Sequence, residues 1–275
     1  MRPVILYRGK EFEEQEFNAA FDAGFYCTDS RMMIPKNSLV IARYSCLPFY
    51  QEQERDLEWS GSRLINNYAQ HRYIADIGNW YPDLKDLTPE TWERTFEIPE
   101  SEEGPFILKG ETNSKKHLFA THMFAKTRGD IGRVLGNLLD DSLIAQQKIY
   151  IRKFVPLVTY MKGINLLPVT KEYRFFVAYG QVVSGGFYWS SHVEDLKDLE
   201  VAIEPPECVP REFLDKVIQR IGHNANAITI DVAQLENGQW IVVELNDLQM
   251  SGLSENDPKK FYSELYRIVS SQKSP

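Results

Sequence analysis

One segment of the 275-residue chain, ITIDVAQLENGQWIVVELN at residues 228–246, carries two carboxylates and a carboxamide at a spacing that could bind a metal ion. Two runs of strand-forming residues flank an Asn-Gly pair at 237–238, a strong signal for a β-hairpin with a two-residue loop. With such a loop Asp231 falls opposite Glu244. Asn246 lies on the same face as Glu244, because side chains alternate along a strand. The hairpin therefore predicts three oxygen-bearing side chains close together.

The two opposed carboxylates need a positive partner, because like charges facing each other destabilise a sheet by roughly 0.2–1 kcal/mol. The hard oxygen atoms of Asp231, Glu244 and Asn246 suit Mg²⁺ or Mn²⁺ rather than zinc. Mg²⁺ usually combines one or two carboxylates with phosphate oxygens, so the set predicts a phosphate-bearing ligand. The alternative is that each carboxylate pairs with a nearby lysine or arginine.

Three lysines upstream are candidates for binding that phosphate. Lys109 ends the apolar stretch PFILKG, where an ammonium group is costly unless it meets an anion. The polar stretch ETNSKK follows, and its small residues could cradle phosphate with their backbone N–H groups. This stretch also contributes Lys115 and Lys116, for which simple exposure to solvent is the alternative.

Two arginines lie next to apolar strands, where a charged side chain needs an explanation. In KEYRFFVAYGQVV, a turn at residues 179–180 places Arg174 beside bulky apolar residues, where arginine usually binds a carboxylate or phosphate through two hydrogen bonds. Arg43, in IARYSCLPFY, follows a strand at its carboxyl end, the edge at which α/β sheets bind ligands. Arg43 is thus a candidate contact to substrate or phosphate. A structural salt bridge is the alternative for both arginines.

The elements that must position these side chains follow from the apolar periodicity. Short buried strands are expected at 3–7 and 38–43, with an amphipathic helix between them that ends near Gly24. This β-α-β pattern begins an α/β region, and a second helix is expected at 64–81. Residues 82–105 are rich in Pro, Asp and Glu, which is typical of a connector.

The rest of the chain is expected to be α+β and then antiparallel hairpins. Helices are predicted around 210–221 and from Pro258, with Asp257 as the N-cap. We therefore predict an N-terminal α/β domain at 1–100, a central lobe at 101–160 and a C-terminal lobe at 161–275.

Bulk composition is that of an ordinary globular protein, with 43% hydrophobic and 25% charged residues. The formal net charge of −8 argues against general binding to nucleic acid but allows a local basic pocket for an anion. Three cysteines without CxxC spacing argue against a disulfide framework or a zinc site and favour the reducing cytoplasm. No run of about 18 apolar residues occurs and a charge interrupts the N-terminus early, so we expect neither a membrane span nor a signal peptide.

The motifs occur in the order found in the ATP-grasp superfamily, which the chain resembles. That order is FILKG, a mobile loop, YIRKFVPL, EYRFFVAYGQ and IDVAQLENGQWIVVELN. The spacing D-x12-E-x-N is the superfamily's metal pattern and is the most specific of these signals. The motifs span residues 104–252, and residues 1–100 look like the small α/β domain that precedes the grasp. The resemblance, to a divergent small clade of bacteria and phages, implies ATP sandwiched between a central and a C-terminal lobe.

The resemblance also implies roles for individual residues. Lys109 would bind the α- and β-phosphates of ATP, and Arg174 would stabilise the transferred phosphoryl group. The hinge would consist of Lys153, Phe154 and Val155, with backbone groups of the first and last reading the adenine edge. The hairpin with its D-x12-E-x-N pattern would hold one or two Mg²⁺ ions that bridge the phosphates.

Three positions depart from the superfamily pattern. Relatives often carry a lysine near the end of the first domain, where this chain offers His71 or Arg72. An acidic residue often precedes the adenine contact at the hinge, where this chain has Arg152. The phosphate loop lacks glycine, so Lys115 or Lys116 would supply by charge what backbone amides supply elsewhere.

As an enzyme, such a protein would transfer the γ-phosphate of ATP to a carboxylate and join the acyl phosphate to an amine, with a small molecule or a peptide as substrate. A kinase of a small hydroxyl-bearing molecule would use the same fold with another acceptor. A nucleotide-binding module without turnover is the third hypothesis, against which the complete set of Asp231, Glu244 and Asn246 argues. The sequence does not separate the first two.

Overall fold

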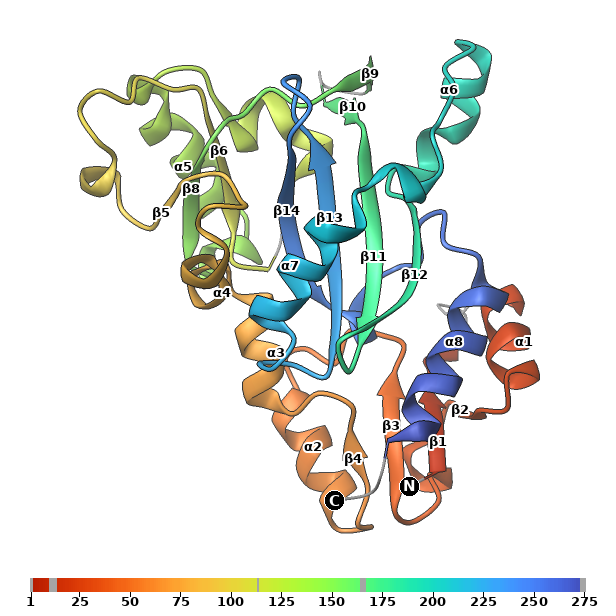
Figure 1. Cartoon of the computed structure of the whole chain (residues 1–275). Helices are drawn as coiled ribbons and strands as arrows, with labels where there is room; N and C mark the ends of the chain where they lie inside the picture. The colour runs from red at the N-terminus through yellow and green to blue at the C-terminus, as the bar shows by residue number, and fades with distance from the viewer. Residues whose placement is uncertain (1, 10–13, 113, 164–166, 273–275) are drawn as a thin grey trace.

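The computed structural model describes residues 2–9, 14–112, 114–163 and 167–272, and these residues contain four sheets (Figure 1). Three of the sheets have four strands and the fourth has two. The first sheet lies at one end of the molecule, and the other two large sheets lie side by side at the opposite end. None of the helices in the described residues has both the length and the apolar character that crossing a membrane requires.

The first sheet is parallel, in the order β2-β1-β3-β4. The predicted strands at 3–7 and 38–43 are confirmed as β1 and β3, and the helix predicted between them is confirmed as α1. Alternate residues of β1 pack into two different apolar cores, so the sheet is buried on both faces, as is usual for a parallel sheet. The elements are β1 (Arg2–Leu6), α1 (Glu14–Asp22), β2 (Tyr26–Thr28), β3 (Ser38–Ala42), α2 (Tyr50–Glu58) and β4 (Arg63–Leu64).

The single helix predicted at 64–81 is wrong, because the segment forms two helices. α3 (Tyr68–Ala75) ends and α4 (Ile77–Leu84) begins at Asp76. The Asp76 side chain accepts a hydrogen bond of 2.9 Å from the Gly78 amide. It thereby satisfies one of the amide groups that have no partner at the start of a helix, which stabilises the break.

The central sheet is antiparallel, in the order β5-β8-β6-β7. Its strands are β5 (Thr91–Trp92), β6 (Phe106–Gly110), β7 (Phe124–Ala125) and β8 (Ile149–Lys153). The apolar face of α5 (Ile131–Leu139) covers this sheet and completes its core. β5 belongs to the segment at 82–105 that we expected to be only a connector, so this segment also supplies an edge strand.

The C-terminal sheet is antiparallel, in the order β12-β11-β13-β14. Helix α7 (Arg211–Ile221), predicted at this position, packs on one face. On the other face α8 (Pro258–Ser271) covers Phe176, whereas Arg174, two residues earlier on the same face, lies in a charged region. The strands are β11 (Glu172–Ala178), β12 (Gln181–Phe187), β13 (Ala227–Gln234) and β14 (Trp240–Asp247).

Smaller elements complete this lobe. A two-stranded sheet consists of β9 (Thr159–Lys162) and β10 (Pro168–Thr170), and α6 (Val193–Asp198) follows β12. The turn predicted at residues 179–180 is confirmed: both residues have positive φ angles, 48° and 72°, as a two-residue hairpin loop requires.

The loop of the β13–β14 hairpin has three residues, so the two-residue loop that we predicted is wrong. The Leu235 amide donates to the Gln239 carbonyl at 2.8 Å, which leaves residues 236–238 as the loop. Gly238 has φ +87°, a conformation that glycine adopts more readily than other residues. This loop shifts the pairing of the two strands by one residue relative to the prediction.

A β-bulge in β14 shifts the pairing back. Val232 lies opposite Val242, but the next residue of β13, Asp231, lies opposite Glu244. Val243 is the extra residue that a bulge leaves unpaired. The predicted pairing of Asp231 with Glu244 is therefore confirmed, although a longer loop and a bulge together produce it.

The predicted N-cap of the last helix is confirmed, and we expect Asp257→Ala to lower the free energy of unfolding by about 1 kcal/mol. The Asp257 carboxylate accepts hydrogen bonds from the amides of Lys259 and Lys260 at 2.8 and 3.4 Å, and alanine would leave these amides without that partner. Denaturant unfolding measures the change, with Asp257→Asn as the control that keeps an acceptor. Equal losses in both variants would contradict the capping role.

Candidate active site

The charged part of the C-terminal sheet forms a row across three strands. Arg174 on β11 lies opposite Asp231 on β13, which lies opposite Glu244 on β14. Arg174 donates to both carboxylate oxygens of Asp231, at 2.8 Å each. Lys109, near the end of β6, donates to Glu244 from the central sheet. Four of the predicted site residues thus form two ion pairs side by side, joined where Asp231 lies opposite Glu244. We call this row the ion-pair chain, and it connects the two sheets.

These charged groups are shielded from water, since the exposed fractions of Lys109 and Asp231 are 5% and 1%. Burial lowers the pKa of Lys109, although Glu244 acts in the opposite direction. Burial alone would raise the pKa of Glu244, but the ammonium groups of Lys109 and Lys116 lower it below its usual value. Removing such charges from water is costly, so a buried ion-pair chain is better evidence for a functional site than for stability.

The sequence left open whether each hairpin carboxylate binds a metal ion or pairs with a lysine or arginine. In the structure they form such pairs, Asp231 with Arg174 and Glu244 with Lys109. Among the residues that the structure describes, no group of three or more His, Cys, Asp and Glu side chains could hold a metal ion. The predicted set contains only two carboxylates, so a metal ion there needs further oxygen ligands, such as phosphate. The metal-binding role of the set stays a prediction.

The chemistry of this strand face fits a hard metal ion. Asn246 lies on the same face as Glu244 and opposite Thr229 in the ladder. The Thr229 hydroxyl is buried and has no hydrogen-bond partner among the described residues. An unsatisfied buried hydroxyl costs about 1–3 kcal/mol, a cost that a hydrated cation beside it would remove. Carboxylate, carboxamide and hydroxyl oxygens are the ligands that Mg²⁺ and Mn²⁺ prefer.

A cavity of about 150 Å³ is lined by residues of both the central and the C-terminal sheet; we call it the hinge cavity. The predicted hinge residues Lys153, Phe154 and Val155 all line it. An apolar slot with a few polar groups suits a planar base. Its other apolar walls are Pro89, Ile107, Phe119, Met123, Leu157, Leu167, Pro168, Trp189, Ile241 and Val243.

The hinge backbone is only partly available to a ligand. The Lys153 amide donates to the Glu90 carbonyl at 2.8 Å, and the Phe154 amide donates to the Pro105 carbonyl at 2.9 Å. Of the two backbone groups of Lys153, the carbonyl is therefore the one left to contact a base. The Lys153 side chain forms an ion pair with Glu102.

The polar segment after β6 contacts both lobes through its two adjacent lysines. Lys115 forms an ion pair with Asp141, which follows α5 in the central lobe. Lys116 donates to the hydroxyl of Tyr188, which follows β12 in the C-terminal lobe, and it lines the hinge cavity. Of these two adjacent lysines, the structure brings Lys116 to the site and pairs Lys115 with Asp141.

We expect nucleotide binding to slow amide hydrogen exchange in residues 114–122. Lys116 of this segment lines the hinge cavity and donates to the Tyr188 hydroxyl, and bound phosphate would give it an additional partner. Mass spectrometry with and without a Mg²⁺-ATP analogue measures the change, and peptides from α7 provide the internal control. Unchanged exchange of residues 114–122 in the nucleotide complex would contradict the predicted contact of this segment with phosphate.

One buried carboxylate near the site was not predicted. Glu172 lies two residues before Arg174 on β11, on the same face, and its exposed fraction is 3%. It accepts a hydrogen bond from the Thr170 hydroxyl at 3.2 Å and lines the hinge cavity. Burial raises the pKa of Glu172 to about 7, although Lys116 acts to lower it. The two-residue spacing from Arg174 is the sequence signal that could have identified it.

Arg152 occupies the hinge position where relatives often have an acid, and it links the two sheets. Its guanidinium donates to the carbonyl of Val243, the bulge residue, at 2.6 Å. It also donates to the hydroxyls of Thr88 and Thr91 at 2.7 and 3.2 Å. Burial lowers the pKa of Arg152 to about 10, although Glu244 acts to raise it. One buried cation thus joins the hinge strand to the bulge beside Glu244.

Arg43, the candidate substrate contact, is a buried structural residue. Its Nε and Nη2 atoms lie 2.9 and 2.8 Å from the Glu16 carboxylate. Its Nη1 atom donates to the carbonyls of Leu248 and Ser251 at 2.6 and 2.8 Å. The structure therefore supports the salt-bridge alternative, and the proposed contact between Arg43 and substrate is corrected to a link between β3 and the segment after β14.

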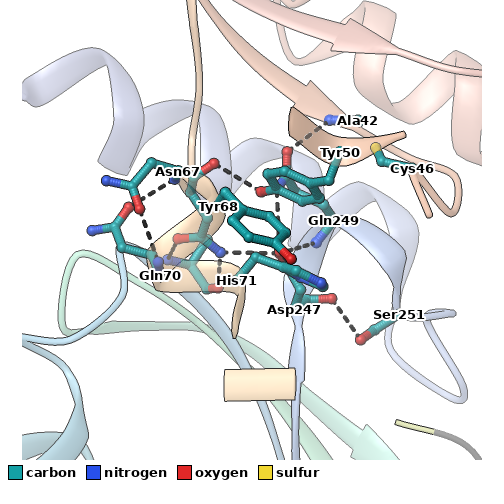
Figure 2. A network of polar contacts seen from close by, with 12 residues as sticks. Ala42, Cys46, Tyr50, Asn67, Tyr68, Gln70, His71, Asp247, Gln249 and Ser251 are labelled. Atoms are coloured by element: carbon teal, nitrogen blue, oxygen red, sulfur yellow. Dashed lines mark hydrogen bonds and ion pairs between the residues drawn. The ribbon is translucent and has the colours of Figure 1, made fainter. Parts of the chain in front are cut away.

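His71 belongs to a buried polar network between the N-terminal sheet and the end of β14 (Figure 2). Its Nδ1 atom lies 3.1 Å from the carboxylate of Asp247, the residue after Asn246, and its ring stacks on Tyr50. Gln249 donates to the Tyr50 hydroxyl and accepts a hydrogen bond from the Ala42 amide of β3. His71 therefore anchors β14 and does not line the hinge cavity. Arg72 forms ion pairs with Asp76 and Glu111.

Solved structures with this arrangement of sheets are ATP-grasp proteins, and the chain has the ATP-grasp fold with a small N-terminal α/β domain that we predicted. D-cycloserine synthetase DcsG is 11% identical, over 97% of this chain and 99% of that chain, with a TM-score of 0.58. D-alanine–D-alanine ligase from Bacillus anthracis, complexed with ATP, is 13% identical over 98% and 95%, with a TM-score of 0.57. ATP-grasp ligase PsnB, complexed with precursor peptide PsnA2 and AMPPNP, is 11% identical over 98% and 96%, with a TM-score of 0.56.

The family is defined by a sequence match rather than by these distant structures. The model of the ATP-grasp domain, R2K clade family 3, matches residues 90–265, and the chain belongs to this family. The matched range begins just before β5 and includes Lys109, Arg174, Asp231 and Glu244, together with every lining residue of the hinge cavity except Pro89. No curated protein matches the chain.

Proposed function

We propose that the protein is an ATP- and Mg²⁺-dependent ligase that joins a carboxylate to an amine through an acyl phosphate. The observation that carries this proposal is the chain Lys109–Glu244–Asp231–Arg174, which lies between two sheets and beside a cavity suited to a base. The fold neighbours described above include ligases, which supports ligation as the general class of reaction.

In this proposal the hinge cavity holds adenine, with the Val155 amide and the Lys153 carbonyl at its polar edge. Lys109 and Lys116 hold phosphate oxygens. The hairpin set Asp231, Glu244 and Asn246 holds Mg²⁺, which when bound offsets the charge of the triphosphate. Asp231 and Glu244 are then released from their present cations, so Arg174 and Lys109 become available to the phosphates.

The proposed reaction has two steps. A carboxylate oxygen forms a bond to the γ-phosphorus, the bond from that phosphorus to the β,γ-bridging oxygen breaks, and ADP leaves with the electron pair. The amine then attacks the carbonyl carbon and loses a proton, and inorganic phosphate leaves. Arg174 stabilises the transferred phosphoryl group because its planar guanidinium can donate two parallel hydrogen bonds to the oxygens that gain charge.

A product screen with ATP, Mg²⁺ and a panel of carboxylic acids and amines tests the proposal. A ligase gives ADP and phosphate without AMP, and only when acid and amine are both present. Hydroxylamine in place of the amine gives a hydroxamate from the acyl phosphate. A stable phosphoester without hydroxamate would identify a kinase, and the absence of ADP under all conditions would identify a module that binds nucleotide without turnover.

A further inference from the structure

A second cavity, of about 430 Å³, adjoins the hinge cavity, because Lys116, Leu167 and Trp189 line both. We call it the serine cavity, since its walls include Ser190, Ser191 and Ser254. Arg174 also lines the serine cavity, but none of the three hinge residues does. The cavity therefore lies at the Arg174 end of the site.

The position of the serine cavity relative to the ion-pair chain determines which part of a bound ATP it would face. If the hinge cavity holds the base, the phosphates extend toward Lys109 and Arg174, which are joined through Glu244 and Asp231. The terminal phosphoryl group then lies next to the serine cavity, because Arg174 lines that cavity. A molecule that receives this group has to approach from there.

The walls of the serine cavity carry positive charge. They include Lys116 and Arg174, and none of the described lining residues is Asp or Glu. The Lys116 ammonium lies 4.1 Å from the centre of the Tyr188 ring and 5.0 Å from that of Trp189, and it donates to the Tyr188 hydroxyl. Among the described residues Lys116 forms no ion pair with a carboxylate, although the charges of Glu172 and Glu244 act on it from nearby. A partly buried cation whose direct contacts are neutral groups favours an anionic ligand.

Neutral hydrogen-bonding groups complete the cavity. The hydroxyls of Ser190, Ser191 and Ser254 can bind the uncharged polar groups of a small molecule. Tyr188 contacts both cations, since the Arg174 guanidinium lies 4.8 Å from the centre of its ring. None of the described lining residues offers a carboxylate to an ammonium group, because Asp231, the partner of Arg174, does not line the cavity.

We propose that the serine cavity binds the acceptor acid, and that this acid is a small carboxylate without a neighbouring ammonium group. Such acids include simple carboxylic acids, N-acylated amino acids and the side-chain carboxylates of acidic residues. This inference rests on the proposed function, since it names the substrate class of the same site. Arg174 and Lys116 contact the phosphates in the proposed function, and they also hold the carboxylate beside the terminal phosphoryl group. Tyr188, which contacts both cations, positions them.

Ligand-observed NMR on the full chain with Mg²⁺-AMPPNP tests this proposal directly. The anionic probes are propionate, glutarate and N-acetylalanine. The matched probes are alanine, which adds an ammonium group, and N-acetylalaninamide, which lacks the charge. We expect at least one anionic probe to bind about 10-fold or more tightly than both matched probes. Equal binding of alanine and N-acetylalanine would overturn the proposal. It would also be overturned if none of the anionic probes bound at about 10 mM, a concentration that corresponds to very weak affinity.

A substitution that fills the cavity locates the binding site. Ser191 is exposed, lines the serine cavity and does not line the hinge cavity, so Ser191→Trp should abolish binding of the acid and leave the dissociation constant of ATP unchanged. The control is Ser263→Trp, which introduces the same side chain at an exposed position on α8 outside the serine cavity. If Ser191→Trp lowers the melting temperature, Ser191→Leu replaces it. Full binding of the acid by a folded Ser191 variant would contradict the assignment.

The two proposals fail in different ways. Acid binding that is lost in Ser191→Trp, with no ADP formed with any amine, would leave the serine cavity as an anion site and reject the ligase. Formation of ADP and hydroxamate with free amino acids, unaffected by Ser191→Trp, would retain the ligase and reject the serine cavity as the acceptor site.

Discussion

Replacing Arg174 by lysine is expected to lower turnover about 100-fold or more, while ATP binds almost as well as before. Lysine keeps one positive charge but not the two parallel hydrogen bonds that arginine makes, which Asp231 accepts in the present structure at 2.8 Å each. The developing charge on the transferred group would lose one of its donors, whereas the ground state would lose little. The rate of ADP release in the presence of acid and hydroxylamine measures turnover, and titration with a fluorescent ATP analogue measures affinity.

Two further variants separate this effect from others. Arg220→Lys changes a surface arginine paired with Asp86, and it should alter neither turnover nor affinity. Lys109→Ala should instead weaken ATP binding, because Lys109 is the cation that reaches the site from the central sheet. If Arg174→Lys lowered affinity and turnover in proportion, Arg174 would have a binding role and not the proposed role in the transition state.

Glu244→Gln is expected to remove the metal-dependent part of the thermal stabilisation by ATP. Binding of Mg²⁺-ATP to the native state should raise the melting temperature of the unchanged protein more than ATP with a chelator does. Glutamine lacks the charge that Mg²⁺ requires, so the two conditions should give the same melting temperature in the variant. The variant should also be less stable without ligand, because Lys109 would lose its carboxylate partner and breaking a buried pair costs about 3–5 kcal/mol.

Glu236→Gln is the matched control for this experiment. Glu236 is an exposed residue in the loop of the same hairpin, and its replacement by glutamine removes one negative charge, as Glu244→Gln does. Its variant should keep both the stability and the response to Mg²⁺. A metal-dependent shift that survives in Glu244→Gln would mean that the hairpin does not hold the metal ion.

The paired carboxylates could be predicted from the sequence because two local signals sufficed. Alternating strand residues and an Asn-Gly pair define a hairpin, and the count along its strands brings Asp231 opposite Glu244. The loop length could not be read in the same way, because an Asn-Gly sequence allows either a two-residue loop or a three-residue loop with Gly238 at positive φ. The bulge compensated for this error, so the predicted pair was confirmed for a reason that the sequence did not reveal.

Contacts between distant segments were harder to predict. Lys109 and Arg174 could be identified from the sequence because each is a cation in an apolar strand. A cation in such a place needs an anion as its partner. The sequence did not show that Lys116 would contact Tyr188, 72 positions away, while Lys115 paired with Asp141 in the central lobe. Such choices between adjacent residues depend on how the lobes pack, and strand or helix periodicity carries no information about that.

The bulge at Val243 has a consequence for how this hairpin can change during evolution. Side-chain direction in a strand has a parity: a shift by one residue exchanges the two faces, and a shift by two restores them. Relative to a hairpin with a two-residue loop and no bulge, the three-residue loop and the bulge each shift the strand pairing by one residue. The two shifts cancel, so Glu244 stays on the face of Asp231. Loss of either one alone would turn Glu244 toward the apolar core under α7, so functional relatives should keep both features or lack both.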